Sequence, residues 1–98
     1  MVNGKMKGCD LSVGQIVKSK AGRDREECFI VYEIIDDEYV LLVDGKTRKI
    51  SKPKKKKVKH LQKYKTVIDN FKTMKEQNEF NDALVRRLIK SKKLQEET

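Results

Sequence analysis

The chain has 98 residues, of which 37% are hydrophobic and 40% are charged, so it can form a single domain with only a small core. No segment approaches the roughly 20 apolar residues of a membrane-spanning helix, and the start of the chain resembles neither a signal peptide nor a myristoylation motif. The net charge of +9 favours an acidic partner, and we expect a cytoplasmic protein without a membrane contact.

The N-terminal half of the chain predicts β-strands. Residues 1–10 show no apolar period and are expected to form a flexible segment. Residues 11–20 predict a first strand. After a polar loop, residues 28–36 predict a second strand because they are rich in β-branched and aromatic side chains. Residues 39–43 predict a third.

A hairpin is expected next. Asp44-Gly45 tolerates the positive φ angles of a two-residue type I′ turn, and residues 46–50 alternate polar and apolar side chains as a returning fourth strand. Connections this short favour an antiparallel meander, because parallel strands need long crossovers. A short meander buries its apolar side chains best when it curls into a small β-barrel, which we place with a basic extension at residues 11–65.

The C-terminal third predicts helices. Val58, Leu61 and Tyr64 recur at intervals of three, as in one or two helical turns lying against the barrel. In residues 81–94 the apolar side chains recur at helical spacing after Asn81, a suitable N-cap residue. We therefore expect residues 66–98 to form a helical C-terminal segment with one or two helices.

Catalytic and metal sites are not expected. His60 is the single histidine and lies among lysines, so a phosphate contact is favoured over a catalytic base. Two cysteines and one histidine are too few for a structural zinc site, and we expect no enzymatic activity, no metal and no cofactor. Cys9 and Cys28 could form a disulfide, but two reduced thiols are favoured because nothing indicates export to an oxidising compartment.

Positive charge is concentrated between Asp44 and Asp69. This stretch contains eleven basic residues and no acidic residue, whereas the rest of the chain has 13 basic and 15 acidic residues. Like charges at this density repel one another, and a nucleic-acid backbone would remove that repulsion. A solvated lysine surface, a nuclear-import signal and a membrane-surface contact are the alternatives. The interleaved apolar residues favour nucleic acid, since they can anchor the block while the lysines face outward.

Several short motifs between Val13 and Lys59 are shared with a known family. They are Gly14 with Ile16-Val17, the SKAGRD run from Ser19 to Asp24, the apolar second strand, Asp37 with Tyr39-Val40, Asp44-Gly45, Arg48-Lys49, and Pro53 with the four lysines that follow it. On these motifs, about half of the chain resembles bacterial KOW-domain RNA-binding proteins, relatives of the archaeal and eukaryotic large-subunit ribosomal protein fourteen.

The resemblance implies an SH3-like barrel, no enzymatic activity, and ribosomal or other structured RNA as the ligand. It also implies that the loop around Gly22 lies near RNA, where glycine permits a close approach. The family tends to have Lys-Gly after Arg-Asp, whereas this chain has Arg25, Glu26 and Glu27, and the two carboxylates would repel phosphate. We expect a ribonucleoprotein role in translation, with ribosomal RNA as partner and the ribosome or other ribosomal proteins as further candidates.

The predicted RNA contacts combine this loop with the basic block. They are Lys18, Lys20, Gly22, Arg23, Arg25, Lys46, Arg48, Lys49, Lys54, Lys55, Lys56, Lys57, Lys59 and His60. Lysine ammonium groups suit phosphates rather than bases, so binding is expected to depend on the RNA backbone and its shape. A protein-interaction module or a transcription-associated factor is the alternative function, because fold alone does not fix the ligand. The role of the C-terminal helix and the oligomeric state stay open.

Overall fold

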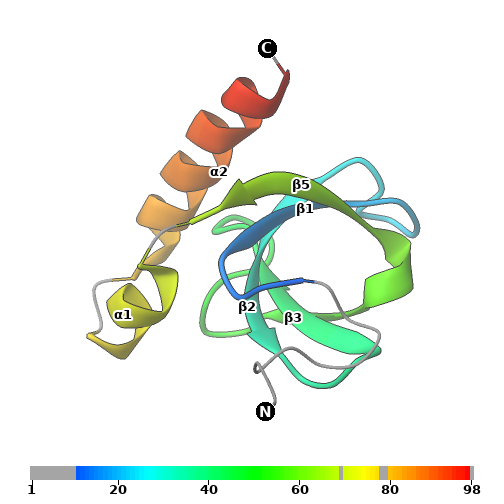
Figure 1. The fold of residues 1–98 in the computed structure, drawn as a ribbon, viewed down its shortest axis with the longest axis horizontal. Coiled ribbons are helices and arrows are strands. Elements are labelled where there is room, and N and C mark those ends of the chain that lie inside the picture. Colours follow the sequence, from blue (N-terminus) through cyan, green and yellow to red (C-terminus); the bar gives the residue numbers. More distant parts are fainter. Residues whose placement is uncertain (1–10, 69, 78–79, 98) are drawn as a thin grey trace.

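The computed structural model describes residues 11–68, 70–77 and 80–97, with side chains as far as Ser91. The flexible segment predicted for residues 1–10, and Cys9 within it, lie outside the described residues. Strands come first and helices follow, as Figure 1 shows. The elements are β1 (Gln15–Ser19), β2 (Cys28–Ile34), β3 (Tyr39–Val43), β4 (Lys54–Lys57), the 3-10 helix η1 (Val58–His60), β5 (Leu61–Val67), α1 (Phe71–Glu76) and α2 (Asp82–Glu97).

The strands form one five-stranded antiparallel sheet in the order β4-β3-β2-β1-β5. The sheet is strongly curved, and both α-helices lie to one side of it (Figure 1). Its edge strands, β4 and β5, do not pair with each other in the described part of the chain, so the sheet is open. A mainly β fold with C-terminal helices was predicted and is confirmed.

Apolar side chains of β1, β2 and β3 are buried on both faces of the sheet, because successive side chains of a strand point to opposite faces. One core cluster contains Leu11, Val17, Phe29, Val31, Val40, Leu42 and Leu61. The other includes side chains from the helices and contains Ile16, Ile30, Val43, Ile68, Phe71 and Val85. Burial on both faces explains why these strands are nearly continuous apolar runs in the sequence.

The predicted C-terminal helix is confirmed as α2. Asn81 is its N-cap, since Asn81 Oδ1 accepts a hydrogen bond from the Leu84 amide at 2.8 Å. Val85 is fully buried, and Phe80 packs edge-on against Phe71 of α1 with the ring centroids 4.5 Å apart. The two helices therefore cover the second core cluster. Cys28, at the start of β2, is a buried free thiol.

The prediction of a fourth strand at residues 46–50 is wrong. These residues belong to a loop, and β4 begins only after it, where it pairs with β3. The cause is the buried Asp44, whose carboxylate accepts hydrogen bonds at 2.8 to 2.9 Å from the Lys46 and Arg48 amides and from the Thr47 hydroxyl. These bonds fold the chain into a compact loop where a two-residue hairpin turn was expected.

The prediction of helical turns on Val58, Leu61 and Tyr64 is also wrong, apart from the three residues of η1. The chain continues as β5, which pairs with β1 and extends two residues past the predicted end of the barrel at residue 65. Apolar residues at intervals of three are compatible with a helical turn, but also with a short turn followed by a strand. The backbone N–H and C=O groups along the edge of β1 need partners, and β5 supplies them.

Gly45 lies where the β3–β4 loop meets α2. Its φ angle is +78°, and a Cβ atom there would overlap the Asp82 carbonyl oxygen and come within 2.9 Å of the Arg86 side chain. The other end of the loop is also held on the helix, because the Ile50 amide donates to Asp82 Oδ1 at 2.9 Å. The loop and the first turn of α2 thus pack with no room for a side chain at position 45.

The substitution Gly45→Ala is expected to lower the free energy of unfolding by roughly 2 kcal/mol or more, because positive-φ strain and overlap with α2 act together. Gly22→Ala is the matched control, with a φ angle of +85° but with only the flexible end of Lys56, at 3.3 Å, nearest to its Cβ. Urea unfolding of both variants measures the difference. An equal decrease in the free energy of unfolding for both variants would show that the close approach of α2 to position 45 adds nothing to the cost of the substitution.

Candidate nucleic-acid interface

The loop between β1 and β2, residues 20–27, is shaped by bonds to the end of β1. The Glu26 amide donates to the Ser19 carbonyl at 2.8 Å, and the fully buried Ser19 hydroxyl lies 3.0 Å from Asp24 Oδ1. Gly22 and Glu26 have φ angles of +85° and +74°, so the chain reverses its course within a few residues. The loop therefore has a defined shape that can present its basic side chains.

A lysine from β4 fastens this loop to the sheet. Lys56 Nζ lies 2.9 Å from Asp24 Oδ1 and donates to the Ala21 carbonyl at 3.0 Å. The side chains of Lys56 and Asp24 are only 10% and 14% exposed, so water screens this ion pair weakly. Burial raises the pKa of Asp24, but the hydrogen bonds from Lys56 and Ser19 outweigh it and hold the pKa below its usual value of 3.8.

Both residues of the ion pair line a surface depression of about 550 Å³, which we call the loop groove. Residues from the β1–β2 loop, the β3–β4 loop and β4 line it: Gly22, Arg23, Asp24, Glu27, Lys46, Thr47, Arg48, Lys54 and Lys56. Six of these were predicted as RNA contacts, namely Gly22, Arg23, Lys46, Arg48, Lys54 and Lys56. The fold thus brings together predicted residues that lie more than 30 positions apart in the sequence.

Strand geometry divides the lysine run between the two faces of β4. Lys54 and Lys56 line the loop groove, whereas Lys55 and Lys57 lie over the ring of Tyr39, with their Nζ atoms 4.6 and 5.8 Å from its centroid. The expectation that the lysines all face outward is therefore not met by Lys56, whose ammonium group is bonded within the protein.

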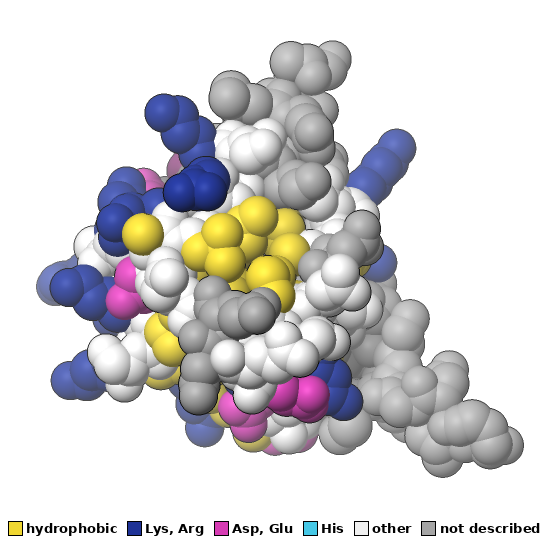
Figure 2. Space-filling view, turned by 90° about the vertical axis from the view of Figure 1, so that its left-hand side faces the viewer, with side chains coloured by type: hydrophobic (Ala, Val, Ile, Leu, Met, Phe, Trp, Pro, Cys, Tyr) yellow, Lys and Arg dark blue, Asp and Glu magenta, His cyan; other side chains and the backbone are white. Residues whose placement is uncertain are grey.

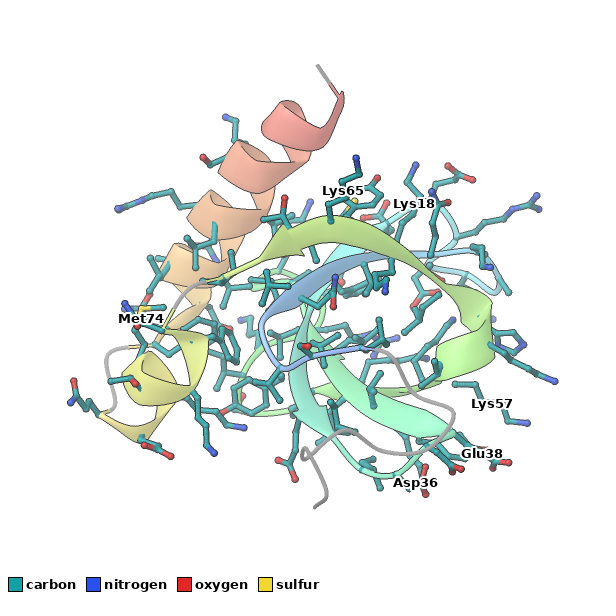
Figure 3. All side chains as sticks on the ribbon, in the orientation of Figure 1. Lys18, Asp36, Glu38, Lys57, Lys65 and Met74 are labelled. Atoms are coloured by element: carbon teal, nitrogen blue, oxygen red, sulfur yellow. The ribbon has the colours of Figure 1, made fainter. Side chains whose placement is uncertain are left out.

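Two lysines at the end of β4 and in η1, Lys57 and Lys59, lie near acidic residues. Figure 3 shows Lys57 on the same side of the molecule as Asp36 and Glu38 of the β2–β3 turn. Lys57 and Lys59 line a smaller depression, of about 220 Å³, together with Asp37 and Glu38. Carboxylates beside these two lysines reduce the local positive potential, so this face is less suited to a polyanion than the loop groove.

The other predicted contacts do not line the loop groove. Lys18 lies 3.6 Å from Glu26, and a hydrogen bond with the Tyr64 hydroxyl raises the pKa of Lys18. The rest lie on the β1–β2 loop, the β3–β4 loop, the outer face of β4 and η1: Lys20, Arg25, Lys49, Lys55, Lys57, Lys59 and His60. Their assignment as RNA contacts stays a prediction.

Two acidic residues of this region had not been predicted as parts of the site. Asp24 was recognised only as a member of a sequence motif, yet it pairs with Lys56 and holds the loop. Its second oxygen, Oδ2, is buried and has no hydrogen-bond partner among the described residues. Glu27 lines the loop groove and places a carboxylate among its cations. The repulsion of phosphate by Glu27 was expected from the sequence, whereas the pairing of Asp24 with Lys56 depends on how the β1–β2 loop packs against β4, which no local sequence pattern indicates.

No protein-family model matches this chain, and no curated protein matches it either. The described residues include no group of three or more histidine, cysteine, aspartate or glutamate side chains that could hold a metal ion. None of the helices in the described ranges combines the length and the apolar character needed to cross a bilayer. The geometry of the loop groove is therefore the main basis for assigning a function.

The substitution Asp24→Asn is expected to destabilise the protein by roughly 1 to 3 kcal/mol at pH 7, because it removes a charged partner from the buried Lys56. A carboxylate with a lowered folded-state pKa stabilises the fold above its unfolded pKa of about 3.8 and loses this effect as the pH falls through the folded value. The stability difference between the variant and the wild type should therefore narrow below about pH 4.

Denaturant unfolding across this pH range measures the effect, and Asp37→Asn, at an exposed position of the β2–β3 turn, is the control. A difference that stays constant from pH 7 to pH 3 would show that the Asp24 charge does not stabilise the fold.

Proposed function

We propose that this protein is a non-catalytic RNA-binding protein that holds the phosphate backbone of RNA in the loop groove. One observation carries the proposal: basic side chains from three separate segments line a single depression. Because the Lys56 charge is neutralised by Asp24, the loop groove presents Arg23, Lys46, Arg48 and Lys54 to a ligand, opposed only by Glu27 among its lining residues. Such a concentration of cations attracts a polyanion from a distance and holds it by phosphate contacts.

The lining residues indicate how RNA would be recognised. None of the described residues that line the loop groove is aromatic, so the groove offers no ring on which an unpaired base could stack. Lysine and arginine contacts to phosphates fix position and register without reading sequence. Recognition through the backbone and shape of a folded RNA follows from this composition.

A role in or beside the ribosome is part of the same proposal. The sheet is open between β4 and β5, but its five short antiparallel strands and its strong curvature support an incompletely closed SH3-like barrel of the KOW type, as the sequence resemblance implies. The conformation of the β1–β2 loop, with its positive φ angle at Gly22, agrees with a loop that approaches a ligand closely. On this proposal the ligand is ribosomal RNA, and the protein acts in the cytoplasm.

A protein partner is the second candidate. Figure 2 shows hydrophobic side chains gathered on the face of the molecule where the helices lie. Val67, at the end of β5, is 40% exposed, and Met74 and Phe80 near it in sequence are only partly buried. Apolar surface of this kind is used in protein contacts. A protein-interaction module would have little affinity for RNA at near-physiological salt, which separates it from the first proposal.

The first test is a salt titration of binding to a folded ribosomal RNA transcript. Four cations of the loop groove have no ion-pair partner among the described residues, and they predict a slope of log K against log salt of roughly −3 to −4. The substitution Lys54→Ala should weaken binding and reduce the slope by about one, because it removes one phosphate contact. Lys52→Ala is the matched control, because Lys52 is an exposed lysine of the β3–β4 loop that was not predicted as an RNA contact and does not line the loop groove. Equal effects of the two variants would contradict the loop groove as the binding site.

The second test removes a carboxylate that is expected to repel RNA phosphates from the loop groove. Glu27→Gln should tighten binding to the same transcript by about fivefold at low salt, because a carboxylate no longer faces the phosphates. Glu76→Gln changes the net charge equally at an exposed position of α1 and should alter affinity far less. A gain of affinity cannot come from loss of folding, so an unchanged affinity of Glu27→Gln would count directly against RNA in this groove.

A further inference from the structure

A second surface depression, of about 370 Å³, adjoins the loop groove, and we call it the helix groove. It is lined by Glu27, Cys28, Asp44, Lys46, Arg86, Ile89 and Lys90. Glu27 and Lys46 line both grooves, so the two depressions meet at these residues. The cationic surface therefore continues from the sheet onto α2, a helix that lies outside the region of sequence resemblance.

Arg86 and Lys90 reach this surface because α2 is fastened to the β3–β4 loop. Arg86 Nη1 donates to the Gly45 carbonyl at 2.6 Å, which holds the guanidinium beside the loop that carries Lys46. Lys90 follows one helical turn later, on the same face of α2. An arginine has five N–H donors, so the bond to Gly45 leaves donors that a phosphate can use.

The charges of the helix groove favour an anion. Lys46, Arg86 and Lys90 are cationic and exposed. The Asp44 carboxylate is buried and accepts three hydrogen bonds from its own loop, which disperse its charge. Glu27 is then the one exposed carboxylate among the described lining residues, against three exposed cations.

We infer that α2 is part of the RNA-binding surface: the RNA backbone crosses from the loop groove over Lys46 into the helix groove, where Arg86 and Lys90 bind further phosphates. This inference rests on the proposed function, since it extends the same binding site. Lys46 is the central contact because it borders both grooves. The helix thus has two roles, covering the core with Val85 and binding RNA with its cationic face.

The test is a comparison of Lys90→Ala with Arg87→Ala in the full chain. Both residues are exposed cations of α2, but Arg87 is not among the residues that line either groove. Binding to a folded ribosomal RNA transcript is measured over a series of salt concentrations. We expect Lys90→Ala to weaken binding and to reduce the salt slope by about one, and Arg87→Ala to leave both close to the wild-type values.

The variant Lys54→Ala, within the loop groove, distinguishes a failure of the inference about α2 from a failure of the proposed function. If Lys54→Ala weakens binding and Lys90→Ala does not, the RNA stays within the loop groove and the role of α2 is refuted, while the proposed function survives. Equal losses for Lys90→Ala and Arg87→Ala would also refute it, because net charge alone would then explain the effect. If the wild-type protein does not bind the transcript even at low salt, the proposed function itself fails.

Discussion

The ion pair between Lys56 and Asp24 determines the shape of the candidate interface. Lys56 belongs to β4 at the edge of the sheet, and Asp24 belongs to the β1–β2 loop, so the pair joins two walls of the loop groove. An ion pair that is largely removed from water needs further hydrogen bonds, which Ser19 and the Ala21 carbonyl provide. One lysine of the basic block, Lys56, is thus bonded within the protein, and the other cations that line the loop groove remain available to a ligand.

The alternation of side chains along β4 explains why charge density in the sequence overstates the charge available to one ligand. Four consecutive lysines form two pairs that point to opposite faces of the strand. One pair faces the loop groove, and the other lies over Tyr39 near the acidic β2–β3 turn. Only part of the basic block can contact the same stretch of RNA backbone, and residues distant in sequence, such as Arg23, complete the surface.

The sequence was sufficient to predict the elements that their own side chains specify. The apolar runs of β1, β2 and β3 and the Asn81 cap of α2 are local signals, and the structure agrees with them. By contrast, β4 has no apolar pattern, and the apolar side chains at the start of β5 recur at intervals of three, so neither sequence predicts a strand. Both segments are strands because the backbone groups of β3 and β1 need hydrogen-bond partners. Six of the nine residues that line the loop groove were predicted individually, but their grouping and the internal role of Lys56 depend on how the strands and loops pack together.

The position of α2 links the stability of the fold to the geometry of the candidate interface. The β3–β4 loop supplies Lys46 and Arg48 to the loop groove, and α2 holds this loop through the Gly45 carbonyl and the Ile50 amide. Loop side chains that are held in place lose less conformational entropy when they bind a ligand than freely moving ones. A helix with no part in the basic block therefore orients the cations of that block, whether or not its own cationic face touches RNA.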